Sequence, residues 1–422
     1  MLNDYHICMY YYHFYVYLLC IFVTFSDPFH KMITYSSAHF CAPVLSLLSL
    51  YKNQLTFIQT SLEMNKKKSF NKKVVFLYKI RKVYTIMEKL KLPKEYHSEL
   101  SLHDTQVAIK TVKDFFQSML SARLNLQRVS APLFVDPTSG LNDNLNGVER
   151  PVAFDILNDK DHTGEIVQSL AKWKRFALKK YGFNVEEGLY TDMNAIRRDE
   201  ETDNIHSIFV DQWDWEKVIR KEDRNLDYLK ETVRQVYKIL RKTEKFLSIQ
   251  YDYIEEILPH DIFFITTQEL EDMFPEYTPK EREYYITKAK GAVCIMKIGD
   301  KLASGEPHDG RAPDYDDWEL NADILVYYPV LDIALELSSM GIRVDENSLK
   351  SQLEKAGCTD RAKLPFQKAI LNKELPYTIG GGIGQSRICM FFLRKAHIGE
   401  VQSSLWPLET EKACAENGIQ LL

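Results

Sequence analysis

The chain has 422 residues, and 45% of them are apolar, which is enough for a sizeable buried core. Residues 1–86 hold ten of the 54 basic and three of the 59 acidic residues, which leaves 44 and 56 for the rest of the chain and a formal charge of −12 there. Such an acidic body argues against a large surface that binds nucleic-acid phosphates. The seven cysteines are scattered, odd in number and without Cys-x-x-Cys spacing, which favours a reducing compartment and no structural zinc.

The first 86 residues differ in composition from the rest. Residues 9–25 are almost wholly apolar and could be a membrane span or a signal segment. However, no basic residue precedes them, no small-residue cleavage pattern follows, and the stretch is rich in Tyr. Our interpretation is that residues 1–86 are a disordered extension or translated upstream sequence, with the native start at Met87. A true membrane anchor is the alternative, but no membrane association is expected.

The body begins with a predicted helix over residues 104–124. Asp104 can cap it, and apolar residues recur at helical spacing along it. Residues 127–135 then alternate like a strand, which Pro132 confines to an edge or a bend. A long helix followed by such a strand suits a dimer interface, although a plain core helix explains the same periodicity.

A polar, glycine-containing loop with Asp143 follows, and its composition alone is typical of a solvated turn. Residues 165–182 then indicate a short strand and an amphipathic helix with Ser169 at the cap position. The first turns of that helix contain three cations: Lys172, Lys174 and Arg175. Because cations there oppose the helix dipole, a ligand carboxylate or phosphate would account for them.

Two neighbouring strands are predicted over residues 188–196 and 207–216. Three polar residues occupy alternate positions of the second strand: Gln212, Asp214 and Glu216. They therefore point to one face, whereas Trp213 and Trp215 point to the other and are predicted to be core. Two carboxylates and an amide aligned on one face favour a binding site over a merely solvated surface.

A helix is predicted over residues 223–250, and a charged loop follows further on. The loop gathers six ionisable side chains within residues 308–318: His308, Asp309, Arg311, Asp314, Asp316 and Asp317.

Residues 323–344 then read as a hairpin. A turn at Pro329 and Val330 would place Asp323 directly opposite Glu336. Two facing carboxylates repel each other unless a cation lies between them. A Mg²⁺ ion bound by one or two carboxylates and by substrate phosphates meets that need, so we predict a metal site there.

Near the C-terminus, four glycines lead straight into a helical pattern: Gly380, Gly381, Gly382 and Gly384. Glycine is needed where backbone approaches a ligand or takes positive φ, and the following helix N-terminus offers N–H donors to an anion. Arg387, in the first helical turn, can stack on a base or bind phosphate. The pattern predicts a nucleotide site. A flexible loop before a core helix is the alternative.

Together these segments resemble a known family. The sequence R-R-D-E at 197–200, the Q-x-D-x-E strand, ELSSMGIR and GIGQSR resemble the catalytic core of class II aminoacyl-tRNA synthetases. More closely, the blocks QSLAKWKR, VDQWDWE, HDGRAPDYDDW and TIGGGIGQSR resemble the ammonia-dependent aspartate–ammonia ligases, the asparagine synthetase A family, over residues 88–422.

The resemblance implies an α+β fold with an antiparallel sheet flanked by helices, a catalytic domain over residues 87–422, and a cytoplasmic homodimer formed through the first helix and the Pro132 strand. It implies ATP-dependent synthesis of L-asparagine from L-aspartate and ammonia. A β-aspartyl-adenylate would form with release of pyrophosphate, and ammonia would then displace AMP. The cofactors would be ATP and Mg²⁺.

The resemblance also implies roles for individual residues. The catalytic residues would be Arg197, which would hold the α-phosphate, Lys174 and Asp143. The aspartate-binding residues would be Ser169, Lys174, Gln212, Asp214 and Asp316. The nucleotide-binding residues would be Arg197, Glu200, Ser207, Ser339, Arg343, Gly382, Gly384 and Arg387. The metal ligands would be Asp323 and Glu336.

Three other functions fit less well. A tRNA synthetase would need an anticodon-binding module, and residues 1–86 lack the alternating strands of an oligonucleotide-binding barrel, so no nucleic-acid partner is expected. A paralogue that only senses an amino acid is disfavoured because Arg197, Glu336 and Arg387 are all present. Glutamine as nitrogen donor would need an activated cysteine nucleophile, and no cysteine lies in such a setting.

Overall fold

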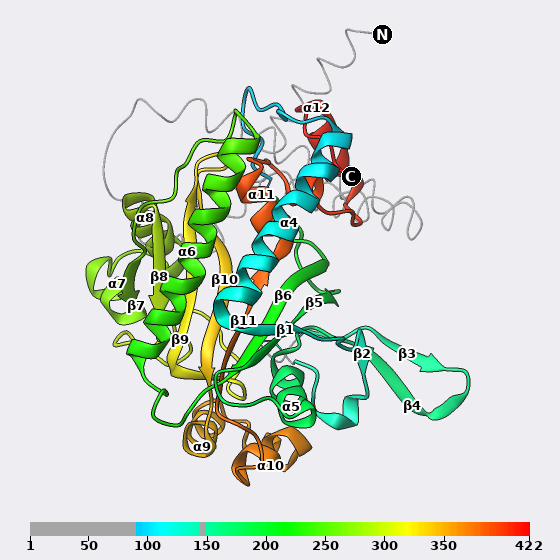
Figure 1. Ribbon diagram of the computed structural model, residues 1–422, viewed down its shortest axis with the longest axis vertical. Coiled ribbons are helices and arrows are strands. Elements are labelled where there is room, and N and C mark those ends of the chain that lie inside the picture. The colour runs from blue at the N-terminus through cyan, green and yellow to red at the C-terminus, as the bar shows by residue number, and fades with distance from the viewer. Residues whose placement is uncertain (1–89, 144, 146–148) are drawn as a thin grey trace, which may run out of the picture. The chain divides into compact units, whose positions relative to one another are not determined.

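The computed structural model describes residues 90–143, 145 and 149–422 (Figure 1). They belong to one structural unit, Lys82–Leu422. The predicted start at Met87 and the interpretation of residues 1–86 lie outside the described residues. No helix among the described residues is both long enough and apolar enough to cross a bilayer.

An eight-stranded sheet is the centre of the fold. Its strands, in spatial order, are β1 (Leu126–Arg128), β5 (Gly188–Ile196), β6 (Phe209–Val218), β11 (Thr378–Gly384), β10 (Ile333–Arg343), β9 (Asp316–Tyr328), β8 (Ala292–Met296) and β7 (Phe263–Thr266). All neighbouring pairs are antiparallel except β1–β5 and β7–β8 at the two edges. The predicted antiparallel α+β sheet is confirmed.

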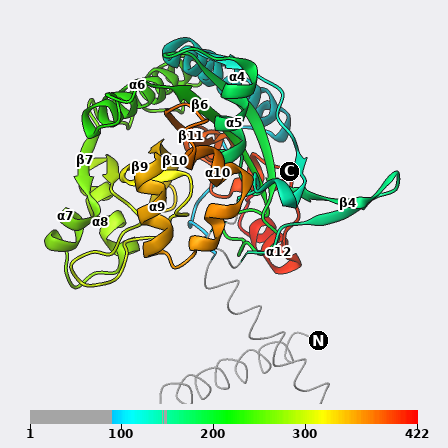
Figure 2. The same cartoon turned by 90° about the horizontal axis from the view of Figure 1, so that it is seen from below.

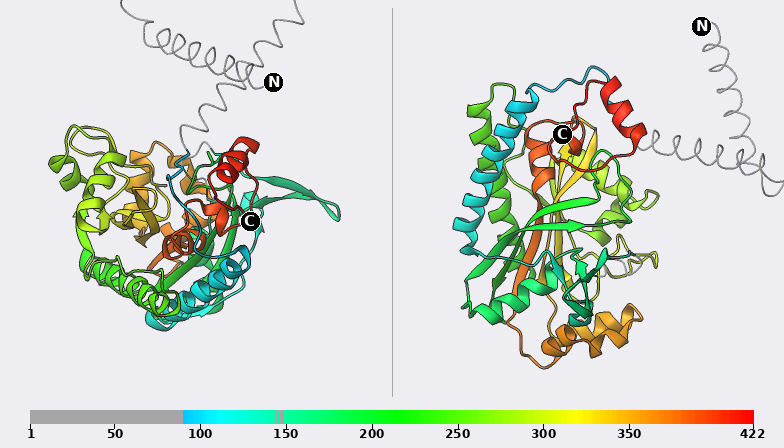
Figure 3. Two further views of the ribbon diagram at one scale, coloured as in Figure 1. Left: turned by 90° about the horizontal axis from the view of Figure 1, so that it is seen from above. Right: turned by 90° about the vertical axis from the view of Figure 1, so that its right-hand side faces the viewer.

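Two long helices, α4 (Leu102–Leu124) and α6 (Leu226–Gln250), lie together on one side of the sheet (Figure 3). Their apolar stripes are buried, and the shorter α11 (Gln385–Phe392) joins the same core. Trp213 and Trp215 point into this core with no exposed surface, and the Phe116 ring stacks on Trp213 at 4.8 Å. The predicted alternation of β6 is therefore confirmed, and its polar residues face the other side of the sheet.

The remaining elements surround the sheet. A second sheet of β2 (Phe134–Val135), β4 (Asp159–Ile166) and β3 (Ala153–Ile156) includes a hairpin that extends away from the rest of the fold (Figure 2). The other α-helices are α5 (Ala171–Tyr181), α7 (Thr267–Met273), α8 (Pro279–Lys290), α9 (Glu346–Lys355), α10 (Pro365–Leu371) and α12 (Leu408–Glu416). Short 3₁₀ turns are η1 (Pro137–Ser139), η2 (Thr359–Lys363) and η3 (Ile398–Glu400).

Several predicted boundaries are wrong by a few residues. Helix α4 is capped by Ser101, whose hydroxyl accepts a hydrogen bond from the Asp104 N–H, so Asp104 is not the cap. The single strand predicted over residues 127–135 is instead two short strands, β1 and β2, which belong to different sheets and flank Pro132. In the charged loop, Asp316 is already the first residue of β9.

The glycine run is a central strand, β11, and not a loop. Gly380 pairs with Glu216 and Gly382 pairs with Asp214 on β6. A Cβ at Gly380 would collide with the Glu216 carboxylate, and a Cβ at Gly382 would collide with the Gln212 amide oxygen. Neither glycine has positive φ. The absence of side chains therefore makes room for the polar residues of β6, which lie across β11.

The predicted hairpin forms, but its register is wrong. Strand β9 ends at Tyr328 and β10 begins at Ile333, so the connection is longer than the expected two-residue turn. Asp323 pairs with Ser339, Glu336 pairs with Leu325, and the register shifts between Glu336 and Ser338. Because strand side chains alternate with period two, Asp323 and Glu336 share a face as diagonal neighbours and are not directly opposed.

We predict that Gly380→Ala lowers the free energy of unfolding by about 2 kcal/mol, because overpacking forces the ion-paired Glu216 to move. Gly384→Ala is the matched control on the same strand, since its Cβ would meet the Arg387 side chain at no less than 3.3 Å. Urea unfolding of both variants measures the difference. Equal losses in the two variants would contradict this account of the glycine strand.

Candidate active site

A cavity of about 580 Å³ opens on the sheet face that lies away from α4 and α6. Strands β6, β10 and β11 contribute residues to it, and so do segments around Asp143, Arg197 and residues 309–316. Every predicted site residue lines this cavity except Asp323. The fold thus brings together residues that are more than 240 positions apart in the sequence, such as Asp143 and Arg387.

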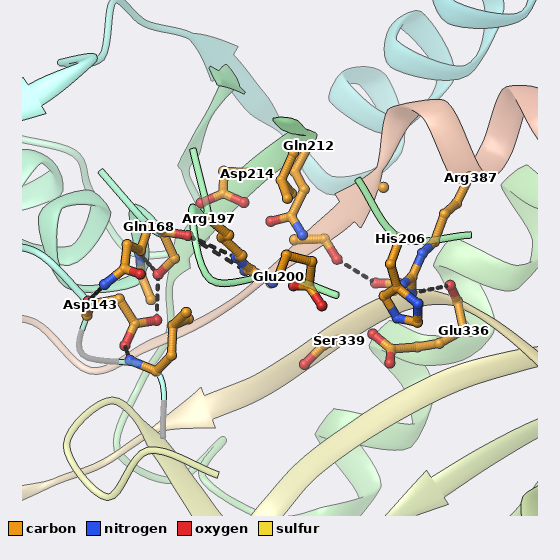
Figure 4. Close-up of a pocket in the computed structure, with 18 of the residues that line it drawn as sticks. Asp143, Gln168, Arg197, Glu200, His206, Gln212, Asp214, Glu336, Ser339 and Arg387 are labelled. Carbon is orange, nitrogen blue, oxygen red and sulfur yellow. Dashed lines mark hydrogen bonds between the residues drawn. The ribbon is translucent and has the colours of Figure 1, made fainter. Parts of the chain in front are cut away.

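At one end of the cavity, Asp143 and Gln168 lie side by side (Figure 4). The Ser169 hydroxyl donates a hydrogen bond of 2.7 Å to the Asp143 carboxylate, and Gln168 Nε2 donates to the Asp143 backbone oxygen at 3.0 Å. Ser169 was predicted to cap α5, but the N-cap position belongs to Leu170. Its hydroxyl proton is directed to a carboxylate in the cavity wall instead.

The three cations of α5 are all buried, and they have different partners. Lys174 lines the cavity, where its Nζ lies 3.2 Å from the Asp214 carboxylate and donates to the Gly381 carbonyl at 2.9 Å. Burial lowers the pKa of Lys174, and Asp214 opposes that shift. Lys172 pairs with Asp314 at 3.0 Å, and Arg175 donates to backbone carbonyls. A ligand is therefore not needed to explain these last two.

Beneath the cavity, buried charges join neighbouring strands. Arg343 on β10 donates to the fully buried Glu216 at 2.8 and 3.0 Å, and its other side is hydrogen-bonded to Asp316 on β9. Thr378 on β11 adds a 2.7 Å bond to Glu216. Burial opposes the ionised form of Glu216, but the adjacent Arg343 and Lys174 cations and the Thr378 hydrogen bond bring its pKa below the ordinary value.

The other end of the cavity carries His206, Glu336, Ser339 and Arg387, and Arg197 and Glu200 lie between the two ends (Figure 4). Within the described chain, the Arg197 guanidinium contacts the Gln168 backbone carbonyl at 3.4 Å, and Arg387 donates to the backbone carbonyls of Glu336 and Ile205. Both guanidiniums thus retain positive charge that no carboxylate among these contacts neutralises. They are suited to an anion or to the face of a base.

Asp323 is the predicted site residue that the cavity does not include. Arg311 covers it with a 2.6 Å contact to the carboxylate and also donates to Ser339 at 2.7 Å. Burial raises the pKa of Asp323 to about 6, Arg311 opposes the rise, and the neighbouring Glu336 adds to it. Of the two predicted metal ligands, only Glu336 therefore faces the cavity directly.

The carboxylates fit a Mg²⁺ ion only in part. The charge of Glu336 raises the pKa of Asp323, and a cation between the two carboxylates would relieve that repulsion. No group of three or more His, Cys, Asp or Glu side chains in the described residues is arranged to hold a metal ion. A Mg²⁺ ion at Glu336 would accordingly need phosphate and water oxygens to complete its coordination.

The family model described as aspartate–ammonia ligase matches residues 103–418. An aspartate–ammonia ligase of Clostridium tetani is 64% identical over 335 residues, which cover 79% of this chain and 98% of the relative. One of Lactobacillus johnsonii is 60% identical over 332 residues, with 78% and 99% covered. This chain belongs to the aspartate–ammonia ligase family.

Solved structures with the same fold include an asparaginyl-tRNA synthetase of Pyrococcus horikoshii complexed with asparaginyl-adenylate. It has a TM-score of 0.53 and 13% identity, and 72% of this chain and 70% of that chain are covered. The asparaginyl-tRNA synthetase of Entamoeba histolytica gives a TM-score of 0.51 at 10% identity, with 71% and 67% covered. The aspartate–ammonia ligase chain thus has the class II aminoacyl-tRNA synthetase fold.

Several residues of the cavity were not predicted from the sequence. Asp211 accepts from the Ser386 N–H and from Gln402 Nε2, both at 3.1 Å, and pairs with Lys113 of α4 at 3.1 Å, so it holds the first turn of α11 beside Arg387. In β6, Asp211 has the opposite parity to Gln212, Asp214 and Glu216. The alternation that pointed to those three residues therefore gave no reason to include Asp211. Three other residues that line the cavity were also not predicted as site residues: His206, Lys280 and Tyr315.

We predict that Glu216→Gln lowers the free energy of unfolding by about 3 kcal/mol, because it removes one partner of a buried ion pair. The pKa of Glu216 is below its ordinary value in the folded state, so its contribution is present above pH 4.5 and is lost as the pH falls through the lowered value. Urea unfolding from acid to neutral pH should show the wild type and the variant converging in acid.

Glu186→Gln is the control, since Glu186 forms a more exposed ion pair with Lys217, the neighbour of Glu216 on β6. It should change the free energy of unfolding by less than about 1 kcal/mol. A pH-independent difference between wild type and Glu216→Gln would show that the buried charge is not the cause.

Proposed function

We propose that this chain synthesises L-asparagine from L-aspartate, ammonia and ATP through a β-aspartyl-adenylate, with AMP and pyrophosphate as the other products. The observation that carries the proposal is one cavity with two unlike ends. One end holds Asp143 and Gln168, the other holds Glu336 and Arg387, and Arg197 lies between them (Figure 4). Membership of the aspartate–ammonia ligase family supports the same reaction.

The first end suits aspartate. A free amino acid with an acidic side chain presents one ammonium and two carboxylates, and the cavity offers Lys174 beside Asp214 and Ser169 beside Asp143. We assign the α-ammonium and α-carboxylate of aspartate to Asp214, Lys174, Ser169 and Gln212. Asp316, which Arg343 holds in place, completes this end. The β-carboxylate then points toward Arg197.

Adenylate formation needs little covalent chemistry from the protein. An oxygen of the aspartate β-carboxylate attacks the α-phosphorus of ATP, and the bond to the oxygen bridging to the β-phosphate breaks. We assign Arg197 to the α-phosphate, where charge develops. The described contacts of its guanidinium are with a backbone carbonyl and include no carboxylate, so its charge is available to a phosphate. Positioning and electrostatic stabilisation then supply most of the rate.

The second end suits the nucleotide. Arg387 would lie on the adenine ring, with Glu200, Ser207 and Ser339 around the base and ribose. Gly382 and Gly384 expose backbone where a side chain would narrow the cavity. Mg²⁺, when bound, would neutralise phosphate charge. Glu336 would hold it, and Asp323 would contribute only if Arg311 gives up part of its contact.

Ammonia completes the reaction by attacking the β-carbonyl of the adenylate, and the bond to the AMP phosphate oxygen breaks. The attacking nitrogen must lose a proton, and the Asp143 carboxylate at the aspartate end is our assignment for its acceptor. Ser169 fixes the orientation of that carboxylate by donating to one of its oxygens. Asp143 is therefore proposed as catalytic together with Arg197 and Lys174.

We further propose that residues 87–422 form the catalytic domain and act in the cytoplasm as a homodimer, through α4 and the segment around Pro132. Large apolar side chains on these segments are exposed in the single chain: Leu102, Val107, Leu133 and Phe134. A partner that covers them would remove apolar surface from water. The expected substrates are all small molecules, and no nucleic-acid partner is proposed.

The direct test is to supply aspartate, ATP, Mg²⁺ and ammonium and to measure AMP, pyrophosphate and asparagine. Arg197→Ala should lower the rate by about a hundredfold or more, the usual weight of a preorganised donor to developing charge. Arg198→Ala, next in the chain but outside the cavity lining, is the control and should retain most of the activity. Charging of tRNA without free asparagine would instead support a synthetase.

The metal assignment makes a separate prediction. Glu336→Gln should raise the free Mg²⁺ needed for half-maximal AMP formation by about tenfold, because one charged ligand is lost. Asp323→Asn should raise it less, since Arg311 already neutralises that carboxylate. The double variant should be non-additive if both act on one ion. An unchanged Mg²⁺ requirement in Glu336→Gln would remove the carboxylate from the metal site.

A further inference from the structure

Lys280 is a cavity residue with no role in the scheme above. It lies in the first turn of α8, which Thr278 caps, and its side chain lines the cavity together with Asp309, Arg311 and Glu336. Burial alone would lower the pKa of Lys280, but the carboxylates of Glu283, Asp309 and Glu336 raise it above its ordinary value. A cation from outside the central sheet therefore reaches the end of the cavity proposed for the nucleotide.

The partners of Lys280 leave most of its side chain in solvent. Its Nζ lies 3.0 Å from the Glu283 carboxylate and 3.5 Å from that of Asp309, and 73% of the side chain is exposed. The pair with Asp309 is exposed on both sides and contributes little stability, whereas Glu283 is largely buried. Both carboxylates also have second partners, since Glu283 contacts His308 Nε2 at 3.1 Å and Asp309 accepts from the Gly310 N–H at 2.7 Å. Both carboxylates therefore keep a second contact when Lys280 moves to another partner.

The other cations of the cavity already have partners or assigned roles and are less available to the β- and γ-phosphates. Three of them are fixed in buried ion pairs with carboxylates: Lys174, Arg311 and Arg343. The scheme above uses Arg197 for the α-phosphate and Arg387 for the base. The β- and γ-phosphates carry most of the nucleotide's charge and would share the metal at Glu336. An ammonium near Glu336 with exchangeable partners fits that charge.

We propose that Lys280 binds the β- and γ-phosphates of ATP and holds the pyrophosphate as it departs. The inference rests on the proposed adenylation. When the aspartate oxygen bonds to the α-phosphorus, the electron pair of the broken bond stays on the bridging oxygen, so the leaving pyrophosphate gains negative charge. The Lys280 ammonium donates hydrogen bonds to it, and no proton is transferred. After pyrophosphate is released, Lys280 again pairs with Glu283 and Asp309.

The test is calorimetric titration of magnesium pyrophosphate into the full chain, in wild type, Lys280→Gln and Lys288→Gln. Lys288 is the matched control because it lies on the same helix and pairs with Asp332 away from the cavity. Lys280→Gln should weaken pyrophosphate binding by about tenfold, the weight of one charge-assisted hydrogen bond, and Lys288→Gln should not. Lys280→Arg should keep most of the affinity.

A kinetic measurement separates binding from general damage. In Lys280→Gln the KM for ATP should rise by a similar factor while the KM for aspartate stays unchanged. Equal pyrophosphate affinity in wild type and Lys280→Gln would overturn the role of Lys280, and so would a parallel rise of both KM values. Pyrophosphate titration needs neither aspartate nor ammonia, so a wild type that makes no AMP would overturn the proposed function by a different result.

Discussion

The structure depends on a chain of buried charges that crosses four strands. Glu216 on β6 lies against Gly380 of β11, accepts from Thr378 of β11, and is paired with Arg343 of β10, which also holds Asp316 at the start of β9. Each of these charges would be costly if buried alone. They are satisfied together only when the four strands are in this register. The same interactions that fix the register therefore fix the floor of the cavity.

The floor and the rim of the cavity differ in how their cations are held. Lys174 and Arg343 on the floor are buried against carboxylates, so their geometry is set before any substrate arrives. Arg197 and Arg387 contact backbone carbonyls, and the side chain of Lys280 is largely exposed although it contacts Glu283. Rigid pairs suit groups that orient a substrate, because misplacement by an ångström reduces the rate. Weak contacts suit groups that must exchange partners as phosphate binds and leaves.

Sequence patterns predicted the parts of this site that depend on local repetition. The period of two along β6 correctly separated Asp214 from Trp213, and the blocks of the family resemblance named residues that do share one cavity. The hairpin register failed because a register shift after Glu336 and a longer connection cannot be read from alternation alone. The prediction that Asp323 lines the site was wrong because Arg311 contacts its carboxylate. Arg311 comes from a loop whose path cannot be read from the sequence.

The environment of the glycine strand β11 also could not be predicted from the sequence. The glycine run predicted a close approach of backbone to a ligand, with a flexible loop as the alternative. In the sheet, it is the neighbouring strand β6 that excludes side chains from β11. Gly382 makes room for Gln212 and Asp214, and Gly380 makes room for Glu216. The lack of side chains on β11 thus leaves space for Gln212, Asp214 and Glu216. Because an acidic chain must bind two anionic substrates, these carboxylates need their cations close by, and the space above the glycines is where that pairing occurs.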